Sequence, residues 1–313
     1  MPTPDADGAV LPDGTEGRSS CAPGDGSAGE RPLLVRTRGE LARARADLPG
    51  PVAAVFTMGA LHEGHASLVR AARRSGRCVV ATVFVNPLQF GAGEDLDAYP
   101  RDLDADLDLL GREGVDVVFA PSAGEMYPDG PPQVVVGAGP LGGVLEGASR
   151  PGHFDGVLTV VAKLLHLTRP DVVLFGQKDA QQLLLVRRMV ADLDMGVEVL
   201  AVPTSREEDG LARSSRNAYL DGDGRRAAPV LSRALRRGEE RAGDGAAAVR
   251  RAAADELARE PDAVVDYLAL VDPGDLAEVG EDHRGPALLA VAARVGTTRL
   301  IDNLPLVLGD PAG

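Results

Sequence analysis

The sequence has few cysteines, no excess of positive charge and no long apolar run. Each absence argues against one class of protein. Only Cys21 and Cys78 are cysteines among 313 residues, so a disulfide framework is not expected and the composition suits a reducing cytoplasm. The formal net charge of -14 argues against a nucleic-acid partner, whose binding depends on neutralising phosphates. No apolar run approaches the roughly 18 residues that cross a membrane, so no membrane partner is expected either.

The first 31 residues also have almost no large apolar side chains. They are rich in Gly, Pro, Asp and Ser and cannot bury enough surface to offset the entropy of ordering, so residues 1–31 are predicted to be disordered. They have neither the basic start nor the apolar core of a secretory signal. The remaining length is sufficient for two domains, predicted over residues 32–204 and 205–313.

Between residues 32 and 204, Val-rich runs alternate with helical patterns. Strands are expected over 52–57, 79–85, 115–120, 171–175 and 197–202, and helices over 64–75, 103–113, 156–167 and 179–193. Continuously apolar strands are typical of a sheet covered on both faces. The pattern therefore predicts an α/β fold with a doubly wound parallel sheet, a Rossmann-like nucleotide-binding domain. From residue 205, two helices (224–241 and 246–260) and three strand-like runs predict a smaller α+β domain.

Polar segments follow four of the predicted strands, and ligands of such sheets bind beyond the carboxyl ends of the strands. In the first segment, "TMGALHEGH", His62 and His65 stand at the start of a helix, where unpaired N–H groups attract anions. Gly59 and Gly64 would let the backbone approach a ligand closely. The histidines could donate to phosphate oxygens. Two alternatives are a zinc-binding pair and two surface histidines that only cap the helix.

Two further segments offer neutral amides and a cation. Asn86 and Gln89 in "FVNPLQF" could bind hydroxyl and carboxylate groups, or only shape an Asn-Pro turn. In "FGQKDAQQ", Lys178 would be a point charge for a phosphate. Asp179 would cap the next helix, and Gln182 falls in its first turn. The alternative is a solvated lysine beside a capping aspartate.

The last segment and a separate stretch add more donors. Ser214, Ser215 and Arg216 in "SSRN" could wrap a triphosphate, or they could belong to a plain interdomain linker. In "LEGASRPGHFDGV", Arg150 and His153 place another cation and another imidazole before a predicted helix. His166 lies in an apolar stretch and is expected to be a packing histidine of the core.

Taken together, the order and spacing of these motifs resemble one family. "TMGALHEGH", "FVNPLQF", "DLDAYPRDLDAD", "MYPDG", "LEGASRPGHFDGVLTVVAKLL", "FGQKDAQQ", "SSRN", "VDYLALVD" and "GTTRLIDN" are similar to motifs of the pantoate–β-alanine ligases (pantothenate synthetases), HIGH-signature nucleotidyltransferases, over residues 33–308. The resemblance implies an enzyme of pantothenate biosynthesis that activates pantoate with Mg-ATP as pantoyl adenylate. β-Alanine then attacks the adenylate, giving pantothenate and AMP. The resemblance also implies a cytoplasmic homodimer, a C-terminal domain that acts as a lid, and Mg²⁺ held largely by ATP with no assigned protein ligand.

The resemblance also implies a role for each matching residue. The catalytic residues would be His62, His65, Lys178, Ser214, Ser215 and Arg216. ATP would be bound by these six and by Met58, Gly59, Gly176 and Asp179; pantoate by Met58, Gln89 and Gln182; and Asn86, Arg150 and His153 would be secondary members of the site. The sequence departs from the family pattern at Phe56, Gln177, Ala180 and Arg213.

Two other functions remain open on the residues alone. The first is a nucleotidyltransferase of the same fold that acts on another acid or on a phosphorylated alcohol. Neutral amides at Gln89 and Gln182 favour a substrate without a phosphate. The second is a non-catalytic nucleotide- or tRNA-binding relative, against which the intact polar set and the acidic composition argue.

Overall fold

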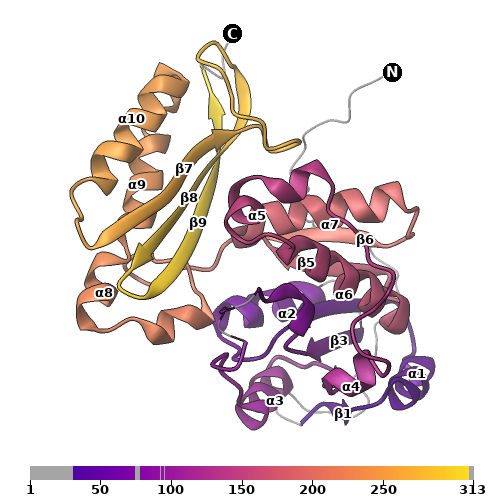
Figure 1. The fold of residues 1–313 in the computed structure, drawn as a ribbon. Helices are drawn as coiled ribbons and strands as arrows, with labels where there is room; N and C mark the ends of the chain where they lie inside the picture. The colour runs from indigo at the N-terminus through magenta and orange to yellow at the C-terminus, as the bar shows by residue number, and fades with distance from the viewer. Residues whose placement is uncertain (1–30, 75–77, 92, 95, 310–313) are drawn as a thin grey trace.

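The protein folds into two parts, each built on its own sheet (Figure 1). The structure, a computed structural model, describes residues 31–74, 78–91, 93–94 and 96–309. The predicted disordered tail lies outside the described residues, apart from Arg31. None of the helices in the described ranges has the length and apolar character that a membrane span requires.

The first sheet has six parallel strands in the spatial order β1-β4-β3-β2-β5-β6. They are β1 (Leu33–Val35), β2 (Val52–Thr57), β3 (Cys78–Val83), β4 (Val117–Phe119), β5 (Val172–Gly176) and β6 (Glu198–Val202). Helices α1 (Arg38–Asp47), α6 (His153–Thr168) and α7 (Ala180–Asp192) cover one face, and α2 (Glu63–Arg74) and α3 (Leu103–Arg112) cover the other. The predicted doubly wound α/β sheet is confirmed.

The strands are continuously apolar because both of their faces are buried. Along β2, Ala54 packs into the core under α1 and α6, whereas its neighbours Ala53 and Val55 pack under α2 and α3. The chain order reverses between β2 and β5. In a doubly wound sheet, the loops beyond the carboxyl ends of such a strand pair form the ligand-binding crevice.

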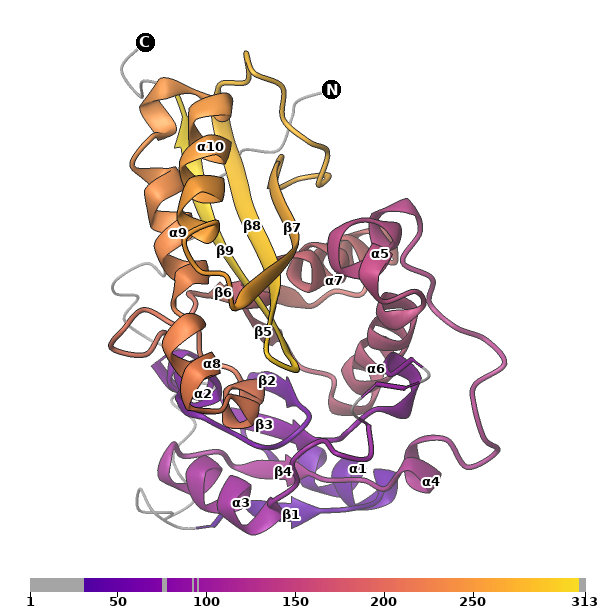
Figure 2. The ribbon, with the colours of Figure 1, turned by 60° about the vertical axis from the view of Figure 1, so that its left-hand side comes forward.

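The second sheet is antiparallel, in the order β7-β8-β9, and forms the predicted α+β domain. Its strands are β7 (Ala263–Val271), β8 (Gly285–Val295) and β9 (Thr298–Leu308). Helices α9 (Val230–Glu239) and α10 (Ala246–Leu257) pack on one face (Figure 2), and α8 (Gly222–Ala227) joins the same core at the end of the sheet nearer the first domain. The other face meets the first domain, where Ala269, Val271 and Leu288 pack against Leu145, Ala180 and Leu184.

The elements differ from the sequence prediction in a few places. β1 and α1 were not predicted, because β1 has three residues and α1 buries only Leu41 and Ala44 behind a capping box of Thr37 and Glu40. The helix predicted over 224–241 is two helices separated at Pro229, which has no N–H to continue the first. Short segments were also missed: α4 (Ala123–Met126), α5 (Leu145–Ser149), η1 (Pro87–Gln89), η2 (Pro140–Gly143), η3 (Gln177–Asp179), η4 (Ser215–Tyr219) and η5 (Ala242–Asp244).

One single-residue expectation also differs. His166 was expected in the core, but it is exposed, because Leu164, Leu165 and Thr168 take the buried face of α6. Its Nδ1 lies 2.7 Å from the carbonyl oxygen of Ala162. Cys78 is buried at the start of β3, and Cys21 lies outside the described residues, so the expectation of reduced cysteines stays a prediction.

Candidate active site

The loop after β2 holds His62 and His65 through two backbone hydrogen bonds. The backbone N–H of Gly64 donates to Nδ1 of His62 at 3.1 Å, and the backbone N–H of His62 donates to Nδ1 of His65 at 3.3 Å. The ring centroids are 4.2 Å apart. His62 thus accepts a hydrogen bond from the first turn of α2, as the helix-capping alternative supposed, and His65 accepts one from His62, the residue that precedes the helix. Since Nδ1 accepts in both rings, each neutral ring carries its proton on Nε2.

Both imidazoles are neutral near pH 7. Burial lowers the pKa of His62 to about 4, and the positive charges of Lys178 and Arg213 act in the same direction. Burial also lowers the pKa of His65 to about 3, with smaller effects of His62 and Lys178. Two neutral Nε2–H donors suit the oxygens of a phosphate. As for the zinc alternative, no group of three or more His, Cys, Asp or Glu side chains suited to a metal ion occurs within the described ranges.

A buried aspartate that the sequence analysis did not single out holds the turn before these histidines. Asp106 on α3 is 3% exposed and accepts hydrogen bonds from the backbone N–H groups of Ala60 at 3.2 Å and Leu61 at 2.7 Å. Burial raises the pKa of its carboxyl group. A Cβ at Gly59, where φ is +87°, would lie 2.9 Å from Asp106 Oδ2. Glycine is therefore required there by the turn itself.

Hydrogen bonds fix the amide of Gln89 at the end of η1. The Tyr127 hydroxyl donates to Asn86 Oδ1 at 2.9 Å, and Asn86 Nδ2 donates to Gln89 Oε1 at 3.2 Å. Gln89 Nε2 in turn lies 3.0 Å from Met58 Sδ, to which it donates. Asn86 is 1% exposed, and burial raises the pKa of Tyr127 to about 12. Because its carbonyl oxygen is occupied, Gln89 offers N–H groups, which suit a carboxylate or hydroxyl oxygen.

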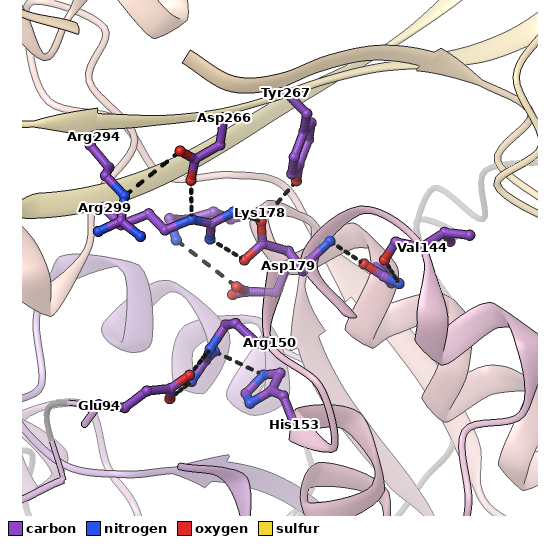
Figure 3. Close-up of polar contacts among 12 residues, drawn as sticks. Glu94, Val144, Arg150, His153, Lys178, Asp179, Asp266, Tyr267, Arg294 and Arg299 are labelled. Atoms are coloured by element: carbon purple, nitrogen blue, oxygen red, sulfur yellow. Dashed lines mark hydrogen bonds and ion pairs between the residues drawn. The ribbon is translucent and has the colours of Figure 1, made fainter. Parts of the chain in front are cut away.

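Arg150 and His153 lie beside Gln89. Arg150 donates to the two carboxylate oxygens of Glu94 at 2.9 and 2.5 Å, and its Nη1 is 3.1 Å from His153 Nε2 (Figure 3). His153 Nδ1 is 2.8 Å from the backbone oxygen of Gln89, so Nδ1 is the donor. Burial, followed by the Arg150 charge, lowers the pKa of His153. These residues therefore hold the backbone at Gln89, and Glu94 offsets the Arg150 charge.

The turn after β5 presents Lys178. Its Nζ lies 4.0 Å from Asp179 Oδ1, and its side chain is 19% exposed. Asp179 stands at the N-cap position of α7, as predicted, but its side chain makes no capping hydrogen bond. The backbone of Asp179, at φ −97° and ψ 61°, is not in the extended conformation from which a capping side chain reaches the helix N–H groups.

The "SSRN" segment forms η4 and closes the site from the side of the second domain. Ser214 Oγ accepts a hydrogen bond from the backbone N–H of Arg216 at 3.3 Å. Ser215 Oγ lies 3.3 Å from the hydroxyl of Tyr99. The segment connects β6 to α8, so it is also the linker between the two domains. Ser214, Ser215 and Arg216 nevertheless line a cavity.

That cavity brings most of the predicted site residues together. Its volume is about 250 Å³, and it shares lining residues with a cavity of about 960 Å³ bounded by both domains. Among the predicted residues, the smaller cavity is lined by Met58, His62, His65, Asn86, Gln89, Arg150, His153, Gly176, Lys178, Asp179, Gln182, Ser214, Ser215 and Arg216. Gly59 lines neither cavity and instead shapes the turn beneath it.

Sequence reasoning missed several residues that hold the site. They lie inside quoted motifs, but no local pattern distinguishes them, because their partners are distant in the chain. Their position inside these motifs was the one sequence feature that could have pointed to them. The missed residues are Tyr99, Asp106, Tyr127, Glu146, Arg299 and Asn303.

Comparison with known proteins decides the family. A family model for pantoate-beta-alanine ligase matches residues 34–305. The chain belongs to this family. It is 57% identical to the pantothenate synthetase of Streptomyces coelicolor, over 89% of this chain and 96% of that protein. It is 59% identical to that of a Nocardioides species, over 90% of this chain and 88% of the relative.

Solved structures of pantothenate synthetases share the fold. The enzyme from Thermus thermophilus superposes with a TM-score of 0.82 at 53% identity, covering 87% of this chain and 98% of the other. The pantoate–β-alanine ligase of Francisella tularensis has a TM-score of 0.72 at 32% identity, covering 87% and 97%. That protein was crystallised as a complex with "beta-gamma ATP" and β-alanine.

Three of the four departures from the pattern of pantoate–β-alanine ligases are accommodated by packing or backbone contacts. The Phe56 ring meets that of Phe175 edge-on, with centroids 6.4 Å apart. Ala180 packs at the contact between the domains. Gln177 takes part through its backbone oxygen, which accepts from Asn303 at 3.0 Å.

The fourth departure, Arg213, adds a positive charge near His62 in the lining of the smaller cavity, which leads to a prediction. Replacing Arg213 with Met is expected to raise the pKa of His62 above about 4, because one of the charges that lower it is removed. It should also weaken ATP binding roughly fivefold, the size of one partly screened ion pair of about 1 kcal/mol. NMR titration of labelled histidine and calorimetric ATP binding measure the two effects.

The matched control is Arg259→Met, which removes an exposed arginine paired with Glu256 after α10. It should leave both quantities unchanged. An unchanged His62 titration in Arg213→Met would show that its charge does not act on the imidazole.

Proposed function

We propose that this chain joins pantoate to β-alanine in two steps, and that different residues around the smaller cavity bind the phosphates and the pantoate. In the first step a pantoate carboxylate oxygen attacks the α-phosphorus of ATP, and the bond to pyrophosphate breaks. In the second step the β-alanine amine attacks the acyl carbon, AMP leaves, and the amine gives up a proton. The observation that carries the proposal is the convergence of two neutral imidazoles, one ammonium and two amides on one cavity.

The phosphate-binding role falls to the donors at the helix ends. His62 and His65 offer Nε2–H groups, and Lys178 adds a positive charge from the opposite loop. Ser214, Ser215 and Arg216 are proposed to bind the β- and γ-phosphates from η4. Charge grows on these oxygens as pyrophosphate departs, and donors already in place stabilise it without reorganisation.

The pantoate-binding role falls to Gln89 and Gln182, with Met58 between the carboxyl group and the nucleotide. Gln89 supports this role because Asn86 and Tyr127 fix its amide as a donor. Asp179 and Gly176 are proposed to lie at the ribose. Neither step requires a covalent enzyme intermediate, so positioning and charge stabilisation are the main contributions.

Magnesium is proposed to enter bound to ATP. Within the described residues no cluster of three or more acidic, histidine or cysteine side chains is suited to a metal ion. Phosphate oxygens and water commonly supply most ligands of Mg²⁺. When bound, the ion would neutralise part of the triphosphate charge.

The remaining features of the proposal rest on the family. We propose a cytoplasmic homodimer, with domains over 32–204 and 205–313 and the second acting as a lid. The cavity of about 960 Å³ bounded by both domains supports a lid that opens and closes. Light scattering of the purified chain would measure its oligomeric state.

Pyrophosphate release tests the proposed reaction. With Mg-ATP, release should require pantoate, and continuous turnover should also require β-alanine, because the adenylate otherwise stays bound. A burst of about one equivalent is expected without β-alanine. Intact ATP binding with no pantoate-dependent release would instead favour a nucleotidyltransferase for another carboxylic acid.

A further inference from the structure

Asn303, in the motif "GTTRLIDN" near the C-terminus, contacts the turn that carries Lys178. The Asn303 side chain lies on β9 and is 5% exposed. Its Nδ2 donates to the backbone oxygen of Gln177 at 3.0 Å and to that of Lys178 at 2.7 Å. One amide group of the second domain thus binds two successive carbonyl groups of η3 in the first domain.

Asn303 is itself held rigidly. Its backbone N–H donates to Asp302 Oδ1 at 2.8 Å. The Asp302 carboxylate, 2% exposed, accepts from Arg206 at 2.6 and 3.0 Å. Arg206 lies in the segment that leads from β6 to the second domain. The contact with the Lys178 turn therefore belongs to a buried network rather than to a loose surface loop.

A second set of contacts reaches the start of α7, directly after the same turn (Figure 3). Arg299 on β9 donates to the two oxygens of Glu146 at 2.6 and 2.8 Å, and the Tyr267 hydroxyl donates to Glu146 at 3.0 Å. The backbone N–H of Glu146 donates to Oε1 of Gln181 at 3.0 Å. Gln181 lies in the first turn of α7, three residues after Lys178, so the second domain also contacts, through Glu146, the helix that follows the turn.

We infer that Asn303 is a positioning residue for Lys178, and that adenylation therefore requires the second domain to be docked on the first. Within the described residues, Lys178 Nζ has one charged neighbour within 4 Å, Asp179 at 4.0 Å. Because the part of the chain that the structure describes gives Nζ no closer side-chain partner than this carboxylate, the backbone of η3 is the element that sets the direction of the ammonium. An error of about 1 Å in such a group can slow a reaction about 100-fold. The inference rests on the proposed role of Lys178.

A double-mutant cycle tests the inference. The variants are Asn303→Ala, Lys178→Ala and the double variant, and the measurement is the rate of the pyrophosphate burst with saturating Mg-ATP and pantoate. Asn303→Ala should slow the burst roughly 30- to 100-fold. Added to Lys178→Ala, it should slow the burst less than about threefold further, because it acts through that lysine. Fully additive losses would overturn the inference.

Leu306→Ala is the matched control for lost packing. Leu306 lies on the same strand and is buried in the core of the second domain. This variant should lower the melting temperature at least as much as Asn303→Ala and leave the burst rate within about threefold of the wild type. If the two variants slow the burst equally, general weakening of the domain explains the effect and the inference is wrong.

Hydrogen exchange separates this inference from the proposed function. Exchange of the backbone amides in residues 176–183 needs no substrate, and it should accelerate at least tenfold in Asn303→Ala but not in Leu306→Ala. Unchanged exchange would refute the positioning role whatever the enzyme activity. Accelerated exchange in a protein that releases no pyrophosphate with pantoate would overturn the proposed reaction and leave the contact supported.

Discussion

Replacing His65 with alanine is expected to slow formation of pantoyl adenylate about 100- to 1000-fold, the usual cost of losing one donor to a developing oxyanion. His65 accepts the backbone N–H of His62 at Nδ1, so its Nε2–H is the group that faces a ligand. Burial holds its pKa at about 3, which keeps the ring a neutral donor over the whole working range. The pyrophosphate burst with saturating Mg-ATP and pantoate measures the rate.

Two further variants make this result specific. His166→Ala removes an exposed histidine from α6 and should not change the burst. His65→Gln keeps an N–H near the position of Nε2 and should recover part of the lost rate. A burst within tenfold of the wild type in His65→Ala would remove this histidine from the catalytic residues.

Replacing Gly156 with alanine is expected to destabilise the protein by about 3 kcal/mol and to raise the KM for pantoate. A Cβ at Gly156 would lie 2.2 Å from the backbone oxygen of Leu88 and 2.7 Å from the backbone nitrogen of Gln89. Contacts this short with backbone atoms force α6 and η1 apart, and overpacking of this kind commonly costs 1–3 kcal/mol or more. The displaced segment carries Gln89, so thermal unfolding and pantoate kinetics should change together.

Gly143→Ala is the matched control, because nothing lies within 4 Å of a Cβ built there. It should leave both stability and the KM for pantoate near their wild-type values. If Gly156→Ala lowers stability but leaves the KM for pantoate unchanged, then α6 shifts in the variant and η1 does not. A fully stable Gly156→Ala protein would contradict the packing of α6 against η1.

The sequence predicted most of the residues that line the candidate site, because these residues directly follow predicted strands. His62, Gln89 and Lys178 come directly after apolar runs, and a parallel sheet brings the ends of such runs to one edge. What could not be read was how each side chain is held. Asp106 binds the Ala60 backbone from 46 residues away, and Asn303 reaches Lys178 across 125 residues.

By itself the sequence determined the fold class, the family and the loops that line the cavity, because periodicity, composition and motif spacing are local properties of the chain. Only the tertiary structure decided that both histidines donate through Nε2, that Gly59 shapes a turn instead of lining the cavity, and that the second domain holds the Lys178 turn. Hydrogen bonds, burial and steric contact between distant segments exist only after the chain has folded. They set protonation, orientation and position, which no local pattern encodes.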